Sequence, residues 1–423
     1  MSTALRIAAA IEGLARARGH LHERSDAEIL GALARVLERF RDASSTCRQE
    51  LEAKLPAASG FAPATVRAGL ELGFEPWTGE ALERLVHAEL KGGDKPGSLV
   101  AHGYPITSVL LAGSIPMPSV LSLLLPLVLR SAVLCKPASR DAITPSLVVD
   151  VLREVDPLLA DCVEIVPFEK HDGDASRAFY STPCVVATGS DETIAEVDRY
   201  LAPQQRRLFY GHRVSIGLID LRRPGDTTIA ALAQDLAQDI ALWDQLGCLS
   251  PIAFYLIGGA DGEPAKFAES LGVALSNAQE RLPRGAVAPE TAAWIARERT
   301  AAEMRAALDG NTVVIASPGT EWTVVLEGDP ELRSAPLHRF IRLLPLASRD
   351  MLPASLAALT PHLAGVALAG FEPDREEVMG QLFHAGASLV TAPGRLQAPP
   401  IDWRRDNQPL LLGMAMLGNC EVG

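Results

Sequence analysis

The sequence predicts an α/β protein with two lobes, each built on a sheet rich in parallel strands. From about residue 99 onward, short apolar runs rich in Val and Ile alternate with helical segments. Strands separated by helices form parallel sheets that are covered on both faces. The alternation resumes after Cys248, and a chain of 423 residues is long enough for two or three domains.

The first ninety residues are predicted to be helical, and the strands of the first lobe follow them. Ser25 and Glu28 have the spacing of a capping box at the start of one helix. The apolar stripe behind this box consists of Ile29, Leu33, Val36, Leu37 and Phe40. The strands of this lobe are predicted at 108–112, 132–135, 163–166 and 184–187, with a helix from Thr144 to Val155.

In the second lobe, a helix is predicted from Thr228 to Leu242, because apolar residues recur there three and four positions apart. We expect Gly247 to end this helix in a left-handed conformation, since Pro251 cannot continue one. Cys248 would then lie on a tight turn. The strands of this lobe are predicted at 253–257, 313–315, 340–344 and 365–368.

The boundary between the lobes is predicted near Asp220 to Asp226, where residues 222–226 read Arg-Arg-Pro-Gly-Asp. Residues 1–220 would hold the N-terminal helices and a dinucleotide-binding domain, and residues 221–395 a catalytic domain with the nucleophilic cysteine. Residues 396–423 would form a tail that returns to the body or to an oligomer interface. The sequence of this tail is too irregular for any element to be assigned.

Composition indicates a soluble globular protein, with 48% hydrophobic and 22% charged residues. The formal charge of −13 argues against binding to nucleic acid or to an anionic membrane surface. The six cysteines form no CxxC pair, and the histidines lack metal-ligand spacing, so no metal site is expected. Scattered cysteines suit a reducing compartment.

The N-terminus lacks the apolar core of a signal peptide, so a cytoplasmic location is expected. The most hydrophobic segment, Pro118 to Cys135, is interrupted by Pro126 and Arg130. Its unbroken apolar run is shorter than the roughly 18 residues that a membrane span requires. We therefore expect a buried helix followed by a strand at this place.

Common catalytic and nucleotide-binding motifs are absent, including GxGxxG, the Walker A motif, GxSxG and HExxH. Four segments occur instead in a fixed order: GSIPMPS (113–119), LCKPASRD (134–141), VVATGSDETI (185–194) and DQLGCLSP (244–251). With their spacing, they resemble the aldehyde dehydrogenase superfamily. Two further segments, YGHRVS (210–215) and PPIDWRRD (399–406), are similar to its acyl-CoA reductase branch of LuxC type. The resemblance implies two α/β lobes with an active-site cleft between them.

The resemblance assigns Lys136 to the adenosine ribose of a nicotinamide cofactor. Lys136 follows a predicted strand, at the edge where open α/β sheets bind ligands, although it could also simply extend to solvent there. Many NAD-specific relatives carry a glutamate where this chain has Ser139. Without that carboxylate, and with Arg140 next to it, a 2′-phosphate would be tolerated. We therefore predict a preference for NADPH, with NADH also possible. The alternative is that Arg140 is an ordinary surface charge.

Gly189 and Ser190 match the Gly-Ser pair that the superfamily places near the cofactor pyrophosphate. The N–H groups at the start of a helix form an anion site. An ordinary helix cap at Ser190 is the alternative.

Cys248 matches the catalytic cysteine of the superfamily. Its thiolate would attack an acyl thioester such as acyl-CoA and form an acyl-enzyme, which hydride then reduces to an aldehyde. The other five cysteines are interpreted as structural.

Two further residues are candidates for the chemistry. Ser114 stands where the superfamily has an asparagine that stabilises the oxyanion, beside the N–H of Cys248. His212 could donate a proton or merely cap a strand. Residues 207–213 lack the glutamate with which aldehyde-oxidising relatives activate water, which favours a reductase. Arg404 and Arg405 could contact a phosphate of CoA, a partner subunit or solvent.

The sequence thus predicts an NADPH-dependent acyl-thioester reductase that forms an aldehyde, with a medium- or long-chain acyl group implied by the branch. The alternatives are an NAD(P)-dependent aldehyde dehydrogenase that releases acid, and a non-catalytic nucleotide-binding protein of an assembly. The resemblance also implies a homodimer or homotetramer, and a companion protein that transfers or carries the acyl group.

Overall fold

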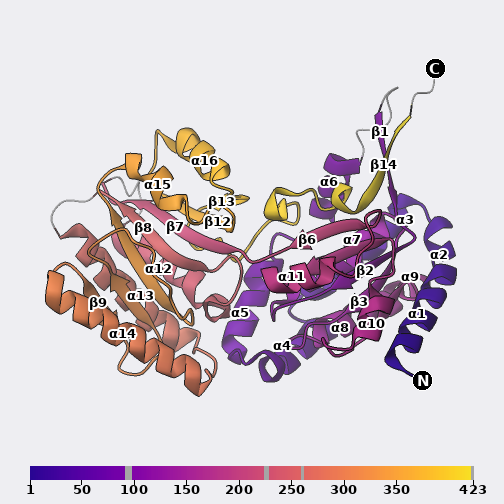
Figure 1. Ribbon diagram of the computed structural model, residues 1–423, viewed down its shortest axis with the longest axis horizontal. Coiled ribbons are helices and arrows are strands. Elements are labelled where there is room, and N and C mark those ends of the chain that lie inside the picture. The colour runs from indigo at the N-terminus through magenta and orange to yellow at the C-terminus, as the bar shows by residue number, and fades with distance from the viewer. Residues whose placement is uncertain (91–97, 223–227, 259–261, 421–423) are drawn as a thin grey trace. The chain divides into compact units, whose positions relative to one another are not determined.

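The computed structural model describes residues 1–90, 98–222, 228–258 and 262–420 (Figure 1). It contains two compact units. Unit 1 comprises residues 1–59, 73–212 and 400–423, and unit 2 comprises residues 60–72 and 213–399. Most of the predicted linker, from Arg223 to Asp226, lies outside the described residues. The domain limits given above stay predictions.

Unit 1 is built on a five-stranded sheet in the order β4-β3-β2-β5-β6, in which all neighbouring strands are parallel. Its strands are β2 (Ile106–Leu110), β3 (Ala132–Lys136), β4 (Val163–Ile165), β5 (Cys184–Thr188) and β6 (Arg206–Tyr210). The strands β3 and β4 lie on one side of β2, and β5 and β6, which follow them in the sequence, lie on its other side. The order therefore reverses between β2 and β5, and such a point is where open α/β sheets bind ligands.

The helices of unit 1 include the predicted helical N-terminus. They are α1 (Thr3–Ala17), α2 (Gly19–His22), α3 (Asp26–Arg41), α4 (Thr46–Ser59), α6 (Gly79–Leu90), α7 (Pro116–Val128), α8 (Ile143–Val155), α9 (Pro157–Ala160), α10 (Gly173–Phe179) and α11 (Asp191–Asp198). The capping box of Ser25 and Glu28 is confirmed at the start of α3. The buried helix and strand predicted for 118–135 are α7 and β3. Among the described residues, no helix is long and apolar enough to cross a membrane.

The C-terminal tail packs on unit 1 through elements that its sequence did not indicate. β14 (Ala415–Cys420) pairs antiparallel with β1 (Ser98–Gly103). Before β14, the Glu89 carboxylate accepts hydrogen bonds from the backbone N–H groups of Leu410, Leu411 and Leu412, at 2.8 to 3.0 Å. The short helix η3 (Arg405–Asn407) precedes these contacts along the chain, and η4 (Leu412–Met414) leads from them into β14.

Unit 2 has a seven-stranded sheet in the order β13-β12-β7-β8-β11-β10-β9. Its strands are β7 (Val214–Asp220), β8 (Pro251–Ile257), β9 (Val313–Ala316), β10 (Thr323–Leu326), β11 (Phe340–Leu346), β12 (Leu363–Ala369) and β13 (Leu389–Thr391). Every pair is parallel except β9 with β10. The parallel-rich sheets predicted for both lobes are thus confirmed.

Helices cover both faces of this sheet, as its apolar strands require (Figure 1). Phe254 and Leu256 pack with α12 (Ile229–Ala241) and α13 (Glu263–Arg281), whereas Tyr255 and Ile257 pack with α15 (Leu352–Leu356) and α16 (Arg375–His384). Unit 2 also contains α14 (Pro289–Asp309), η1 (Leu242–Gln245), η2 (Arg349–Met351) and part of α5 (Pro63–Phe74).

One local prediction is wrong. Gly247 does not adopt a positive φ and does not end the helix before the cysteine. The helix α12 ends at Ala241, and the left-handed residues are Trp243, Asp244 and Gln245, with φ values of 55°, 49° and 64°. Tertiary contacts of these side chains, described below, override the preference of glycine for this conformation.

Candidate functional site

A cavity of about 740 Å³ lies in unit 1 at the carboxyl ends of β2, β3 and β5. It is lined by four of the residues predicted to bind the cofactor, namely Lys136, Ser139, Gly189 and Ser190. These residues come from two turns that are more than forty positions apart in the sequence. The parallel sheet brings them together because β3 and β5 end at the same edge.

Lys136 is the last residue of β3 and is half-buried. Its Nζ atom lies 4.9 Å from the centroid of the Phe168 ring, so the ammonium group is held over an aromatic face. Burial lowers the pKa of Lys136, and the neighbouring Glu169 opposes that shift. The ammonium group is thus aimed along the cavity wall instead of extending freely into solvent.

Gly189 and Ser190 form the turn between β5 and α11. The Ser190 hydroxyl caps α11 by accepting a hydrogen bond from the N–H of Thr193 at 3.3 Å. A Cβ atom on Gly189 would lie 2.8 Å from Cγ2 of Thr193, so only glycine fits this turn without displacement. Ser190 is thus a helix cap that also lines the cavity, and its role toward a cofactor stays a prediction.

Two cations in the cavity wall were missed by sequence reasoning, Lys170 and Arg6. The Nζ atom of Lys170 pairs with a carboxylate oxygen of Glu196 at 3.1 Å. Arg6 projects from the start of α1, and no sequence motif connects it with the cofactor turns. By contrast, Arg140 is exposed and is not among the side chains that line this cavity.

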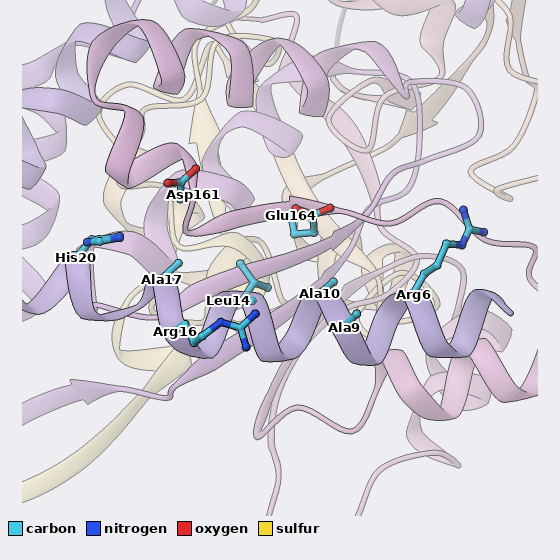
Figure 2. A pocket seen from close by; sticks show the side chains of 10 residues that line it. Arg6, Ala9, Ala10, Leu14, Arg16, Ala17, His20, Asp161 and Glu164 are labelled. Carbon is cyan, nitrogen blue, oxygen red and sulfur yellow. The ribbon is translucent and has the colours of Figure 1, made fainter. Parts of the chain in front are cut away.

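Arg6 also lines a second hollow of about 610 Å³, which runs along α1 (Figure 2). The floor of this hollow is formed by small residues of the helix, such as Ala10 and Ala17, and its far side carries the carboxylates of Asp161 and Glu164. Arg6 therefore lies at the junction of the two hollows.

Cys248 lies on a tight turn of unit 2, as predicted. The N–H of Ser250 donates to the carbonyl of Gly247 at 2.9 Å, and the N–H of Gly247 donates to the Ser250 hydroxyl at 3.2 Å. The carbonyl of Cys248 accepts a hydrogen bond from the Ser215 hydroxyl at 2.9 Å. These three bonds fix the backbone on both sides of the sulfur.

Burial distinguishes Cys248 from the other cysteines whose side chains the structure describes. Cys248 is half-buried, whereas Cys47, Cys135, Cys162 and Cys184 are buried. Desolvation raises the pKa of the Cys47 and Cys162 thiols to about 12 and that of Cys184 to about 11, and it also raises the pKa of Cys135. Since the thiolate is the nucleophile, Cys248 is the best-placed of these five residues.

The remaining candidates lie in unit 1. Ser114 is buried in the loop between β2 and α7, directly after Gly113, which has a φ of 88°. His212 is exposed, and its backbone N–H donates to the Asp191 carboxylate at 2.8 Å.

The segment without the glutamate is covered by the tail. The guanidinium of Arg405 lies 4.2 Å from the centroid of the Tyr210 ring, and Gln408 donates to the carbonyl of Phe209 at 3.3 Å. Burial raises the pKa of Tyr210 to about 12, so this phenol is protonated at neutral pH. Neither the Arg405 guanidinium nor the Tyr210 phenol can replace a carboxylate that activates water.

Solved structures define the class of fold. The chain superposes on gamma-glutamyl-gamma-aminobutyraldehyde dehydrogenase of Burkholderia cenocepacia J2315 with a TM-score of 0.76 and 14% identity, over 98% of this chain and 88% of that one. An NAD-dependent benzaldehyde dehydrogenase of Corynebacterium glutamicum gives a TM-score of 0.72 and 14% identity, over 99% and 90%. The fold is that of the aldehyde dehydrogenases.

Sequence comparison defines the family. A model described as acyl-CoA reductase (LuxC) matches residues 21–406, and the chain belongs to that family. A long-chain acyl-protein thioester reductase of Aliivibrio fischeri is 30% identical over 181 residues, which are 42% of this chain and 36% of that protein. The match thus spans about a third of the length of this curated relative.

Proposed function

We propose that this protein is an acyl-thioester reductase that forms an aldehyde with NADPH through an acyl-enzyme on Cys248. The observation that supports it most is a half-buried cysteine on a hydrogen-bonded turn, in a chain of the acyl-CoA reductase family. The cavity at the carboxyl edge of the unit 1 sheet supports the nucleotide part of the proposal.

In the first half of the reaction, the Cys248 thiolate attacks the carbonyl carbon of the acyl thioester. The thiolate of the donor leaves, and a thioester between the acyl group and Cys248 remains. The N–H of Cys248 and the hydroxyl of Ser114 are proposed to donate to the oxyanion. His212 is proposed to protonate the departing group.

The residues of the cavity fit a dinucleotide. Lys136 would supply a cation to the ribose, Gly189 would let the backbone come close, and the capped start of α11 would offer N–H groups to a phosphate. NADPH, when bound, supplies a hydride to the acyl carbon. Cys248 then leaves as a thiolate, the aldehyde is released, and the thiol is free for a new cycle.

The preference for NADPH over NADH rests on charge. Ser139 brings no carboxylate that would repel a 2′-phosphate, and Lys170 and Arg6 are cations in the cavity wall, where Glu169, Asp172 and Glu196 also lie. Arg140 is exposed and does not line the cavity. Its pairing with a 2′-phosphate, proposed from the sequence, stays a prediction.

The acyl donor is proposed to be acyl-CoA or an acyl group carried on a protein. The family name points to the first donor, and the name of the Aliivibrio fischeri relative points to the second and to a long chain. We also propose a homodimer or homotetramer in the cytoplasm. Light scattering at micromolar protein tests the assembly, and a monomeric mass would contradict it.

The test follows NADPH absorbance during incubation with a series of acyl-CoAs, beside NADH, and with Cys248→Ala and Cys47→Ala as variants. Oxidation that depends on acyl-CoA, disappears in Cys248→Ala and persists in Cys47→Ala would support the proposal. If no acyl-CoA and no acyl-carrier-protein thioester is reduced, the non-catalytic alternative is favoured. Release of acid from an aldehyde at a useful rate without CoA would favour the dehydrogenase instead.

A further inference from the structure

The segment that leads to Cys248 contains a run of left-handed residues that its sequence does not favour. Trp243, Asp244 and Gln245 all have positive φ values, between 49° and 64°, and none of them is glycine. Such residues are disfavoured because Cβ crowds the following carbonyl, and they persist only where their surroundings impose them. The indole N–H of Trp243 is also buried without a hydrogen-bond partner.

A second run of the same kind lies before β11 in the same unit. Leu337, His338 and Arg339 have φ values of 59°, 54° and 68°. The two runs are joined by a buried ion pair, in which Arg339 donates to Oδ1 of Asp244 at 2.6 and 3.1 Å. Both side chains are fully or almost fully buried.

Each member of this ion pair is tied to further groups of unit 2. Oδ2 of Asp244 accepts from the N–H of Gly285 at 2.9 Å. Arg339 donates to the carbonyl of Ala241, the last residue of α12, at 3.1 Å, and to the carbonyl of Leu282 at 2.7 Å. The pair therefore fixes the end of α12 as well as the two left-handed runs.

Gln245 makes the second connection between the two runs. Its side-chain oxygen accepts from the N–H of Phe340 at 2.9 Å. Its amide nitrogen donates to the carbonyl of Phe340 at 3.1 Å and to that of Pro251 at 2.7 Å. Since Pro251 begins β8, these bonds hold both ends of the short segment that carries Cys248.

We propose that the Asp244–Arg339 pair and Gln245 are positioning residues, which hold the Cys248 turn in its reactive orientation by joining two left-handed segments. This inference rests on the proposed function in one respect only, that Cys248 is the nucleophile. Without these contacts, the backbone of residues 243–245 would relax toward an ordinary helical or extended conformation. The turn from Gly247 to Ser250 would then move with it.

A purely structural role is the competing explanation, and the chain offers a matched control for it. Arg342 and Glu327 form another buried ion pair in unit 2, at 2.5 Å, and both are almost fully buried. Glu327→Gln removes the same charge as Asp244→Asn but removes none of the hydrogen bonds that Asp244 and Gln245 make. A general loss of stability would affect Glu327→Gln at least as strongly, because the Glu327 carboxylate pairs with Arg305 as well as with Arg342.

The first measurement is alkylation of Cys248 by iodoacetamide in the full-length protein, followed by mass spectrometry, at a temperature where circular dichroism shows each variant folded. We expect Asp244→Asn to change the rate at least about tenfold relative to Glu327→Gln, because an unpaired buried charge favours open conformations of the turn. Equal rates in wild type and both variants would overturn the proposal. This readout requires neither cofactor nor acyl donor, so it stands even if the proposed activity fails.

The second measurement is the rate at which acyl-CoA acylates Cys248 in a single turnover. Asp244→Asn is expected to slow it by about 100-fold, as misplacement of a reacting atom by about 1 Å can do, without a matching change in KM. Gln245→Met is expected to act in the same direction and serves if Asp244→Asn does not fold. An effect of the same size in Glu327→Gln would show that both pairs act only through stability.

Discussion

At the scale of single residues, solvent access decides which side chains are available for chemistry. The same thiol group is inert inside the unit 1 sheet at Cys135 and available on the turn at Cys248. For the cations, position decides instead, because Lys170 lines the cavity whereas Arg140, close to Lys136 in sequence, is exposed outside the cavity lining.

The cysteines are expected to react with an alkylating reagent in an order that their burial sets. Burial raises the thiol pKa of Cys47 and Cys162 to about 12, so these residues stay protonated up to that pH as long as the fold holds. Iodoacetamide at about pH 8, near the ordinary pKa of a thiol, should label Cys248 first. Peptide mapping after limited reaction measures the order, and faster labelling of any buried cysteine in folded protein would contradict it.

The cofactor preference can be assigned by two matched substitutions. Lys170→Met is expected to lower kcat/KM for NADPH by about tenfold, since it removes a charged partner of the phosphate, and to leave that for NADH nearly unchanged. Arg140→Met should leave both values nearly unchanged. The reverse result would place the 2′-phosphate at Arg140, and equal losses with both cofactors would remove Lys170 from this role.

At the scale of elements, close packing within unit 2 explains why one helical glycine is required. A Cβ atom on Gly69 of α5 would lie 2.3 Å from Cζ2 of the Trp243 indole. Trp243 is fully buried and packs edge-on against Phe61, with ring centroids 5.4 Å apart. The glycine therefore makes room for the ring that begins the left-handed run before Cys248.

Gly69→Ala is accordingly expected to destabilise the protein by about 1–3 kcal/mol through overpacking, although alanine is the better helix former. Gly13→Ala in α1 is the control, since a Cβ atom there meets nothing within 4 Å. It should stabilise α1 by up to about 1 kcal/mol. Urea unfolding measures both, and a stabilising Gly69→Ala would show that the indole moves aside.

At the scale of the whole molecule, one buried acid links stability to pH. Asp239 is fully buried in α12, where it accepts hydrogen bonds from the N–H groups of Gly394 at 2.7 Å and Leu396 at 3.0 Å. Burial raises the pKa of Asp239 from 3.8 to about 8, against the opposing effect of the two hydrogen bonds. The folded protein therefore keeps this carboxyl protonated at pH values where the unfolded chain ionises it.

The contribution of Asp239 to the free energy of unfolding should fall as the pH rises from about 4 to about 8 and should then level off. Asp239→Asn cannot ionise, so its stability should depend less on pH over this range, although the lost acceptor lowers it by about 1 kcal/mol throughout. Urea unfolding at several pH values tests this, with the exposed Asp150→Asn as control. Parallel pH profiles of wild type and Asp239→Asn would refute it.

The fold class, the family, most strands and the candidate residues can all be predicted from the amino-acid sequence. Periodicity reveals buried strands and helices because burial follows the period of each element, and the motifs around Lys136, Gly189 and Cys248 lie within short segments. Strands with charged or short runs, such as β6 and β13, gave too weak a pattern to be predicted.

Features that depend on partners distant in the sequence become visible only in the folded chain. The left-handed run before Cys248 is imposed by Arg339 and Phe340, nearly a hundred positions away, and local propensity favoured Gly247 instead. The tail forms β14 because it pairs with β1, and the Glu89 carboxylate holds the segment just before it. Arg6 and Lys170 joined the cavity because the fold brings α1 and the segment after β4 to one sheet edge, which no local pattern encodes.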